Sequence, residues 1–217
     1  MLDERTCEQC GARFAPRREH ARFCSAACRV AWNTVNTGHP AAQITALEWS
    51  LTAMYGATGR LEQLRTADRF RGLSAISEAV WWVTLVDATL VRYHPADYDL
   101  ILARQVIDER RVIEDTLAGL RFVRNKMGQD LDPADFASPP AVQPAGQDHV
   151  SAWVWRAVPE PACRPAVERG QQWELGRHQS FETQLTGHRI GDTFTRAAAF
   201  LRLVAATAGV TAESAAR

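Results

Sequence analysis

The sequence predicts a mainly α-helical fold in which a small cysteine-rich module is followed by a helical bundle. Four of the five cysteines lie within the first 28 residues. From Ile44 to Met127, and again after residue 170, apolar residues recur at spacings of three and four, which is typical of amphipathic helices. At 217 residues, with 46% hydrophobic residues, the chain is long enough for one good core beside the small module.

The four N-terminal cysteines are spaced as ligands of one metal ion. Cys7 and Cys10 are separated by two residues, so both sulfurs can turn inward from one tight knuckle, and Gly11 supplies the backbone freedom that follows it. Cys24 and Cys28 are four residues apart, so a helix that begins just after Cys24 points both sulfurs to the same side. The pattern predicts a structural Zn²⁺ site, because four thiolates leave no open coordination position for catalysis.

Zinc would also explain how so short a segment folds. About 30 residues bury too little surface to fold alone, whereas a structural zinc contributes about 10 to 16 kcal/mol in small finger peptides. Phe14 and Phe23 would form the small core beside the metal. Disulfides are the alternative use of the cysteines. No signal peptide precedes Cys7 and the N-terminus, Asp3-Glu4-Arg5, is charged, so we expect a reducing cytoplasm and therefore zinc.

Residues 5–33 resemble the FCS and MYM-like zinc fingers, which are treble-clef modules. The resemblance rests on Cys-x-x-Cys-Gly-x-x-Phe followed by Arg-Phe-Cys-Ser-x-x-Cys-Arg. It implies that the module docks on nucleic acid or on protein. If the partner is a nucleic acid, its phosphates or bases would contact four arginines: Arg13, Arg17, Arg18 and Arg22. Through residue 35, however, four acidic residues and the negative zinc–thiolate centre offset six arginines, so a protein partner stays open.

The cysteine module is predicted to span residues 1–36, and the helical bundle residues 44–130. Gly38 and Pro40 separate them, because glycine and proline end a helix. The helices predicted from the apolar spacing within the bundle cover residues 44–55, 61–70, 73–93 and 97–127.

Residues 131–150 are predicted to form an extended, solvent-exposed linker. Four prolines fall in this stretch: Pro133, Pro139, Pro140 and Pro144. In residues 150–158 the pattern alternates, with Trp153 and Trp155 on one face. That alternation predicts a short strand or an extended strip packed on the bundle.

The last part of the chain, residues 151–217, is expected to complete the bundle. Two helices are predicted after the strip, over residues 171–185 and 192–206. Gly187 divides them, and Asp192 is the predicted N-cap of the second.

Charge and hydropathy exclude two classes of protein. The formal net charge is zero, so bulk charge does not indicate a strongly basic nucleic-acid binder. The longest apolar run, Ala79–Val91, has 13 residues and contains Asp87, which is too short and too polar to span a bilayer. We therefore expect a soluble protein with no membrane partner.

Two charged residues interrupt apolar stripes of the predicted helices. Asp87 falls on the stripe of the 73–93 helix, and Arg124 on that of the 97–127 helix. An unpaired buried charge is costly, so we expect either that the two pair across antiparallel helices or that both reach water at an amphipathic edge.

Arg124 and Asn125 also give the bundle a resemblance to HEPN domains. These are all-helical, often dimeric domains, many of them metal-independent ribonucleases, in which an arginine holds the scissile phosphate and a histidine, separated from it by four to six residues, acts on the 2′-hydroxyl. The corresponding positions here, Gln129, Asp130 and Leu131, hold no histidine. The stretch from Leu120 onward also looks like uncharacterised proteins of actinobacteria, which implies no activity.

Three readings of the missing histidine stay open. Gln129 would mark a non-catalytic relative that still binds RNA or a partner. His94, after the 73–93 helix, would replace it in space beside Arg124. Otherwise the arginine and the Gly128 that follows it are ordinary helix-end chemistry.

Trp81 and Trp82 cannot both face one core, because adjacent helix residues point in different directions. One of them should therefore meet a second surface, such as the tail or another subunit, and we expect a homodimer.

Together these observations predict a zinc-containing cytoplasmic binding or regulatory protein. Its finger would dock on nucleic acid, RNA or DNA, or on protein, and its HEPN-like bundle would dimerise without efficient catalysis. The enzyme alternative is a HEPN-type endoribonuclease of toxin or defence type that uses Arg124 and Asn125, with His94 or Gln129 in a compromised role. A structural scaffold is the third reading.

Overall fold

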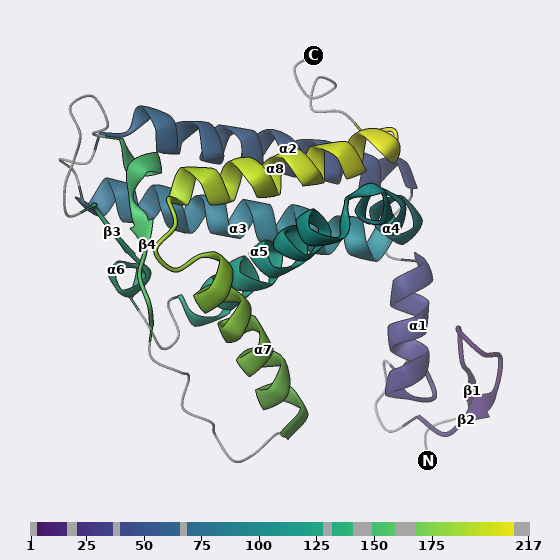
Figure 1. The fold of residues 1–217 in the computed structure, drawn as a ribbon. Helices are drawn as coiled ribbons and strands as arrows, with labels where there is room; N and C mark the ends of the chain where they lie inside the picture. Colours follow the sequence, from purple (N-terminus) through teal and green to yellow (C-terminus); the bar gives the residue numbers. More distant parts are fainter. Residues whose placement is uncertain are drawn as a thin grey trace. The chain divides into compact units, whose positions relative to one another are not determined.

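The protein is mainly helical, as the sequence predicts, and its chain divides into two compact units. The computed structural model describes residues 4–16, 21–36, 40–65, 69–127, 132–140, 149–158 and 168–210. Within these residues there are eight α-helices and two small two-stranded sheets (Figure 1). The first unit is Met1–Ala46 and the second, the helical unit, is Leu47–Arg217.

In the first unit, a small hairpin precedes a helix. β1 (Arg5–Thr6) pairs antiparallel with β2 (Arg13–Phe14). α1 (Ala26–Asn36) follows, and its N-terminus is capped because the Cys28 N–H donates to the Ser25 Oγ at 3.1 Å. α1 thus begins where the cysteine spacing predicts it.

The helical unit contains six longer helices and four short elements. The long ones are α2 (Pro40–Gln63), α3 (Arg69–Tyr93), α4 (Pro95–Arg104), α5 (Ile107–Lys126), α7 (Glu168–Gln184) and α8 (Ile190–Thr207). The short ones are α6 (Pro133–Phe136), β3 (Ala137–Ser138), the 3₁₀ helix η1 (Val150–Ala152) and β4 (Val154–Trp155). The boundary between the units falls within α2. In Figure 1, the axes of α2, α3 and α8 run roughly parallel to one another, while α5 crosses α3 and packs against α7.

Aromatic rings fill part of the core of the helical unit. The rings of Phe122, Phe136 and Phe181 contact one another, with centroids 5.5 to 6.2 Å apart. Trp153 and Trp155 are both fully buried, while Val154 between them is partly exposed, in agreement with the predicted alternation. The segment consists of a 3₁₀ turn, η1, followed by the two-residue strand β4, which pairs antiparallel with β3.

α5 and α7 approach each other closely at Gly119. A Cβ atom at this position would lie 2.9 Å from Cδ1 of Leu185 and 3.1 Å from Cα of Phe181. Only glycine therefore fits this crossing without movement of the neighbouring helix.

Two predicted helix boundaries are wrong. The described residues of the stretch 61–70 form no separate helix, because α2 extends to Gln63 and α3 starts at Arg69. The single helix predicted over 97–127 is divided at Gln105 and Val106, whose extended backbone separates α4 from α5.

The predicted linker is partly folded. Its described residues include α6, which starts with a capping box at Asp132, and Phe136, which is fully buried against Phe122. Residues 132–140 are therefore not the solvent-exposed linker that the prolines suggested, because the Phe136 side chain anchors them in the core. Residues 131 and 141–148 lie outside the described residues.

The last two helices agree with the prediction. α7 and α8 are separated by a turn in which Gly187 has a φ of +80°, a conformation that favours glycine. Asp192 is not the N-cap of α8: the helix starts at Ile190 and Asp192 lies in its first turn. A carboxylate there still interacts favourably with the helix dipole.

α3 is the one helix of the described chain that is long and apolar enough to cross a membrane. Its most apolar 18 residues have a mean hydropathy of 1.2, and half of that window is buried within the protein. A core helix of a soluble protein has the same properties.

Candidate metal centre

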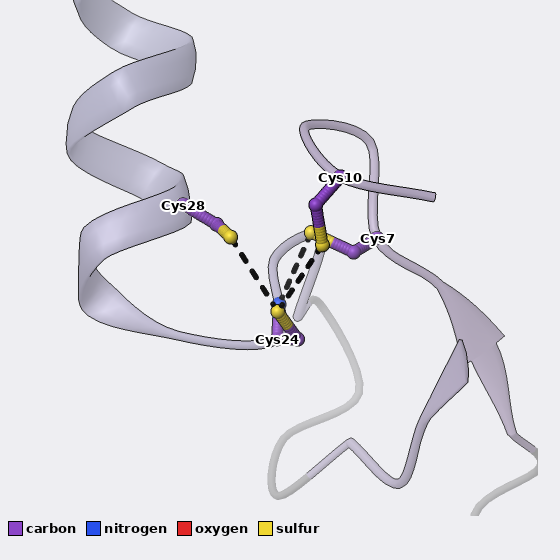
Figure 2. A group of neighbouring side chains, drawn as sticks. All are labelled: Cys7, Cys10, Cys24 and Cys28. Carbon is purple, nitrogen blue, oxygen red and sulfur yellow. Dashed lines mark hydrogen bonds between the residues drawn. The ribbon is translucent and has the colours of Figure 1, made fainter. Parts of the chain in front are cut away.

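The four N-terminal cysteines meet at one point. All four Sγ atoms lie within 4.8 Å of one another. The Sγ of Cys24 is 3.6 Å from that of Cys10 and 3.5 Å from that of Cys28 (Figure 2). Cys7 and Cys10 come from the turn after β1, Cys24 from the segment before α1, and Cys28 from the first turn of α1. These soft donors could together hold a metal ion.

The turn between the strands has the backbone of a knuckle. The Gly11 N–H donates to the Cys7 carbonyl at 2.9 Å, and the Cys7 N–H donates to the Ala12 carbonyl at 2.9 Å. Gly11 has a φ of +71°, in the left-handed region where an L-residue is strained. The glycine thus allows the chain to reverse directly after Cys10.

Hydrogen bonds to the Cys7 sulfur favour its thiolate form, which is the form that binds a metal. Burial by itself raises the pKa of the Cys7 thiol, but backbone N–H groups of Cys24, Cys10 and Gln9 donate to its sulfur and lower the pKa to about 6. The Cys24 thiol, hydrogen-bonded with the sulfurs of Cys28, Cys10 and Cys7, has its pKa raised to about 12. Four thiolates repel one another without a cation, and a metal ion removes that penalty by displacing the remaining protons.

The arginines around the cysteines have acidic partners. Arg22 donates to both carboxylate oxygens of Glu8, at 2.7 Å and 2.5 Å. This pairing lowers the pKa of Glu8 and raises that of Arg22. The Arg22 guanidinium also lies 4.6 Å from the centre of the Trp32 ring. Sequence reasoning missed this pair, because Glu8 and Arg22 belong to different segments of the module.

The other three arginines predicted to contact nucleic acid divide into two groups. Arg13 is exposed and lies 3.9 Å from the Glu4 carboxylate. Arg17 and Arg18 lie outside the described residues.

Among the described residues of the HEPN resemblance, His94 lies apart from Arg124 and Asn125. Arg124 lies over the Trp81 ring, at 4.9 Å from its centre, and Asn125 beside it is half-buried. His94 follows α3, 13 residues beyond Trp81, which is about 20 Å along a helix axis. His94 and Arg124 are therefore not brought together, and Gln129 lies outside the described residues.

Asp87 has a different partner from the one expected. Its carboxylate is fully buried and accepts hydrogen bonds from the Tyr98 hydroxyl at 2.8 Å and from Nε of Arg121 at 2.7 Å. Arg121 also contacts it through a terminal nitrogen. The expected Asp87–Arg124 pair is therefore wrong: the partner of Asp87 is Arg121, which lies about one helical turn before Arg124. Burial, followed by the negative charge of Asp87, raises the pKa of Tyr98.

Comparisons of the chain with protein-family models, curated proteins and solved structures give no match. The resemblances to FCS and MYM-like fingers and to HEPN domains therefore stay predictions based on their motifs.

Proposed function

We propose that the cysteine cluster binds one structural Zn²⁺ and that the finger it stabilises is a protein-docking module attached to a non-catalytic helical unit. The observation that carries this proposal is the convergence of four sulfurs within 4.8 Å. A Zn–S bond of about 2.3 Å gives a tetrahedron with sulfurs about 3.8 Å apart. The 3.5 and 3.6 Å separations at Cys24 need little adjustment to fit it.

The ion would hold together the hairpin turn and the start of α1. In the first unit the two strands have two residues each, and so short a sheet is not stable alone. The four thiolates complete the coordination shell, so the role of the ion is structural. Reduced thiols are required, which is why we place the protein in the cytoplasm.

The charge distribution favours a protein partner over a nucleic acid. Phosphate binding needs uncompensated positive charge, whereas Arg22 is bound to Glu8 and Arg13 lies beside Glu4. Arg22 instead forms a stack with Phe23 and Trp32, whose rings lie 5.5 Å apart. Arginine and tryptophan are the residues that dominate binding energy at protein interfaces.

The placement of Arg124 supports a helical unit without catalysis. Its guanidinium lies over the Trp81 ring, and no hydrogen bond or ring contact joins it to a histidine among the described residues. An endoribonuclease of this type needs a group that moves a proton near neutral pH. The described residues thus offer no partner of this kind to Arg124, which favours the non-catalytic reading.

Titration of the zinc-loaded chain with fluorescent single-stranded RNA and duplex DNA tests the docking proposal. We expect no salt-sensitive binding between about 50 and 200 mM salt, the range in which phosphate contacts are lost. Binding that weakens steeply with salt and disappears in Arg13→Ala or Arg22→Ala would show a nucleic-acid module instead. RNA cleavage abolished by Arg124→Ala, with the fold retained, would show an enzyme.

A further inference from the structure

We infer that the helical unit forms a two-fold symmetric dimer in which the outer face of α3 packs antiparallel against α3 of a second copy. The face is a stripe of five residues at alternating spacings of three and four: Glu78, Trp81, Leu85, Ala88 and Arg92. This spacing is the seam along which two helices pack side by side. The residues will be called the α3 stripe. The inference concerns the helical unit and does not rest on the metal centre.

The α3 stripe is apolar at its middle although it faces outward. The Trp81 residue is 50% exposed, Ala88 is exposed, and Leu85 is partly exposed. The opposite side of the helix buries Ile76, Val80 and Val83 in the core, so α3 is apolar on both sides. Because both sides are apolar, α3 has a high mean hydropathy although only half of its most apolar window is buried. A helix that is apolar all round is normally covered all round.

The sequence of the α3 stripe is complementary to itself when reversed. About a two-fold axis at Leu85, the leucine meets its own copy, the large Trp81 meets the small Ala88, and Glu78 meets Arg92. A two-fold interface requires this reciprocity, in which residue i contacts j and j contacts i. A parallel arrangement would instead place two carboxylates, two guanidinium groups and two indoles opposite each other. Charge and size therefore select a second copy in antiparallel orientation.

The charges at the two ends are available for this pairing. Glu78 is bound to Arg60 of α2 at 2.5 Å, yet its side chain remains 42% exposed. Its carboxylate can therefore accept from a second cation. Arg92 is exposed and lies over the Tyr93 ring, with no carboxylate partner among the described residues.

Residues on the neighbouring helices extend the surface. A stable interface buries about 800 Å² per partner, more than one helix stripe supplies. Trp49 on α2 is 60% exposed and its ring meets that of Trp82 edge-on at 5.0 Å. On α5, the Arg124 guanidinium lies over the Trp81 ring, 4.9 Å from its centre. Together with the α3 stripe these side chains form a surface rich in tryptophan and arginine, the composition of binding hot spots.

Light scattering and sedimentation of the full zinc-loaded chain test the inference. The expected mass is twice 24.1 kDa. Glu78→Arg or Arg92→Glu alone should weaken the dimer by roughly tenfold or more, because each places like charges opposite each other at two equivalent points, and the double exchange should restore it. Leu203→Glu on α8 is the matched control, since Leu203 is 49% exposed but is not part of the proposed dimer surface. Melting curves show whether each variant is folded.

Cross-linking tests the register independently. In a Cys163→Ser background, Leu85→Cys should form an intermolecular disulfide on mild oxidation, identified by mass spectrometry, because residue 85 lies at the axis. Leu203→Cys should not. A monomeric chain would overturn the inference and leave a different protein as the occupant of the surface. A dimer that neither cross-links at residue 85 nor recovers in the double charge exchange would also overturn it.

Discussion

Asp87→Ala should be among the most destabilising single substitutions in the helical unit. The carboxylate is fully buried and receives donors from Tyr98 and Arg121, which are 11 and 34 residues away in the sequence. Alanine leaves the Arg121 guanidinium, whose side chain is 32% exposed, without its counter-charge. It also leaves the nearly buried Tyr98 hydroxyl without its acceptor.

The expected loss of stability follows from the groups that Asp87→Ala leaves without a partner. Removal of one partner from a buried ion pair costs about 3 to 5 kcal/mol, which is about a fifth or more of the roughly 5 to 15 kcal/mol that stabilises a typical domain. At about 2 to 4 °C per kcal/mol for a domain of this size, the melting temperature should fall by roughly 6 to 20 °C. Tyr98→Phe removes one hydrogen bond to a charged group and leaves the ion pair, so it should cost about 1.5 to 3 kcal/mol.

Urea unfolding measured by far-UV circular dichroism and by tryptophan fluorescence provides the assay, because Trp153 and Trp155 are fully buried and report on the core. Arg124→Ala is the control, since its contact with the exposed Trp81 ring is worth about 1 kcal/mol or less. The reasoning is refuted if Asp87→Ala lies within about 1 kcal/mol of the wild type, or if Arg124→Ala costs as much as Arg121→Ala.

Three further predictions concern the packing, the titration and the metal. Gly119→Ala should cost about 1 to 3 kcal/mol in urea unfolding, because its Cβ would lie 3.1 Å from the backbone of α7. Gly59→Ala, where a Cβ meets nothing within 4 Å, should be neutral or stabilising, and equal effects at the two sites would contradict the packing argument. The pKa of Tyr98 is raised in the folded state, which favours the neutral phenol there. The stabilisation that Tyr98 gives the fold is therefore complete below about pH 10, its pKa in the unfolded chain, and is lost progressively as the pH rises above that value. Unfolding free energies measured from pH 8 to 11 should therefore fall less steeply in Tyr98→Phe, and an unchanged slope would contradict this. Chelation at neutral pH should remove the circular dichroism of α1 while the unfolding midpoint of the helical unit stays constant, and simultaneous loss of both would show that the two units do not fold separately.

The parts of the fold that follow from short-range patterns could be predicted from the sequence. Cysteine spacing predicted the convergence of the four sulfurs and the start of α1, and the alternation predicted the burial of Trp153 and Trp155. Gly187 marked the turn between α7 and α8, because its positive φ is a local property.

Boundaries that depend on tertiary contacts could not be predicted. No glycine or proline marks the break at Gln105, where the apolar spacing continues across exposed Val106 and Ile107. The signal was electrostatic: Arg104 ends one helix, and Asp108 and Glu109 open the next.

The candidate sites show the same division. Arg121 and Arg124 lie within one turn of α5, and the apolar stripe alone did not reveal which of them faces Asp87. Tyr98, the third member of that cluster, comes from α4, and only the fold brings it there. The Arg22 bond to Glu8 likewise depends on the folded knuckle.

Elemental analysis combined with native mass spectrometry tests the central claim, that four sulfurs hold one zinc ion, most directly. Protein purified under reducing conditions should carry one zinc per chain. It should lose the ion in Cys24→Ser, whose sulfur lies between those of Cys10 and Cys28, and keep it in Cys163→Ser. Metal-free protein with free thiols or disulfides at Cys7, Cys10, Cys24 and Cys28, or zinc retained in Cys24→Ser, would contradict the account.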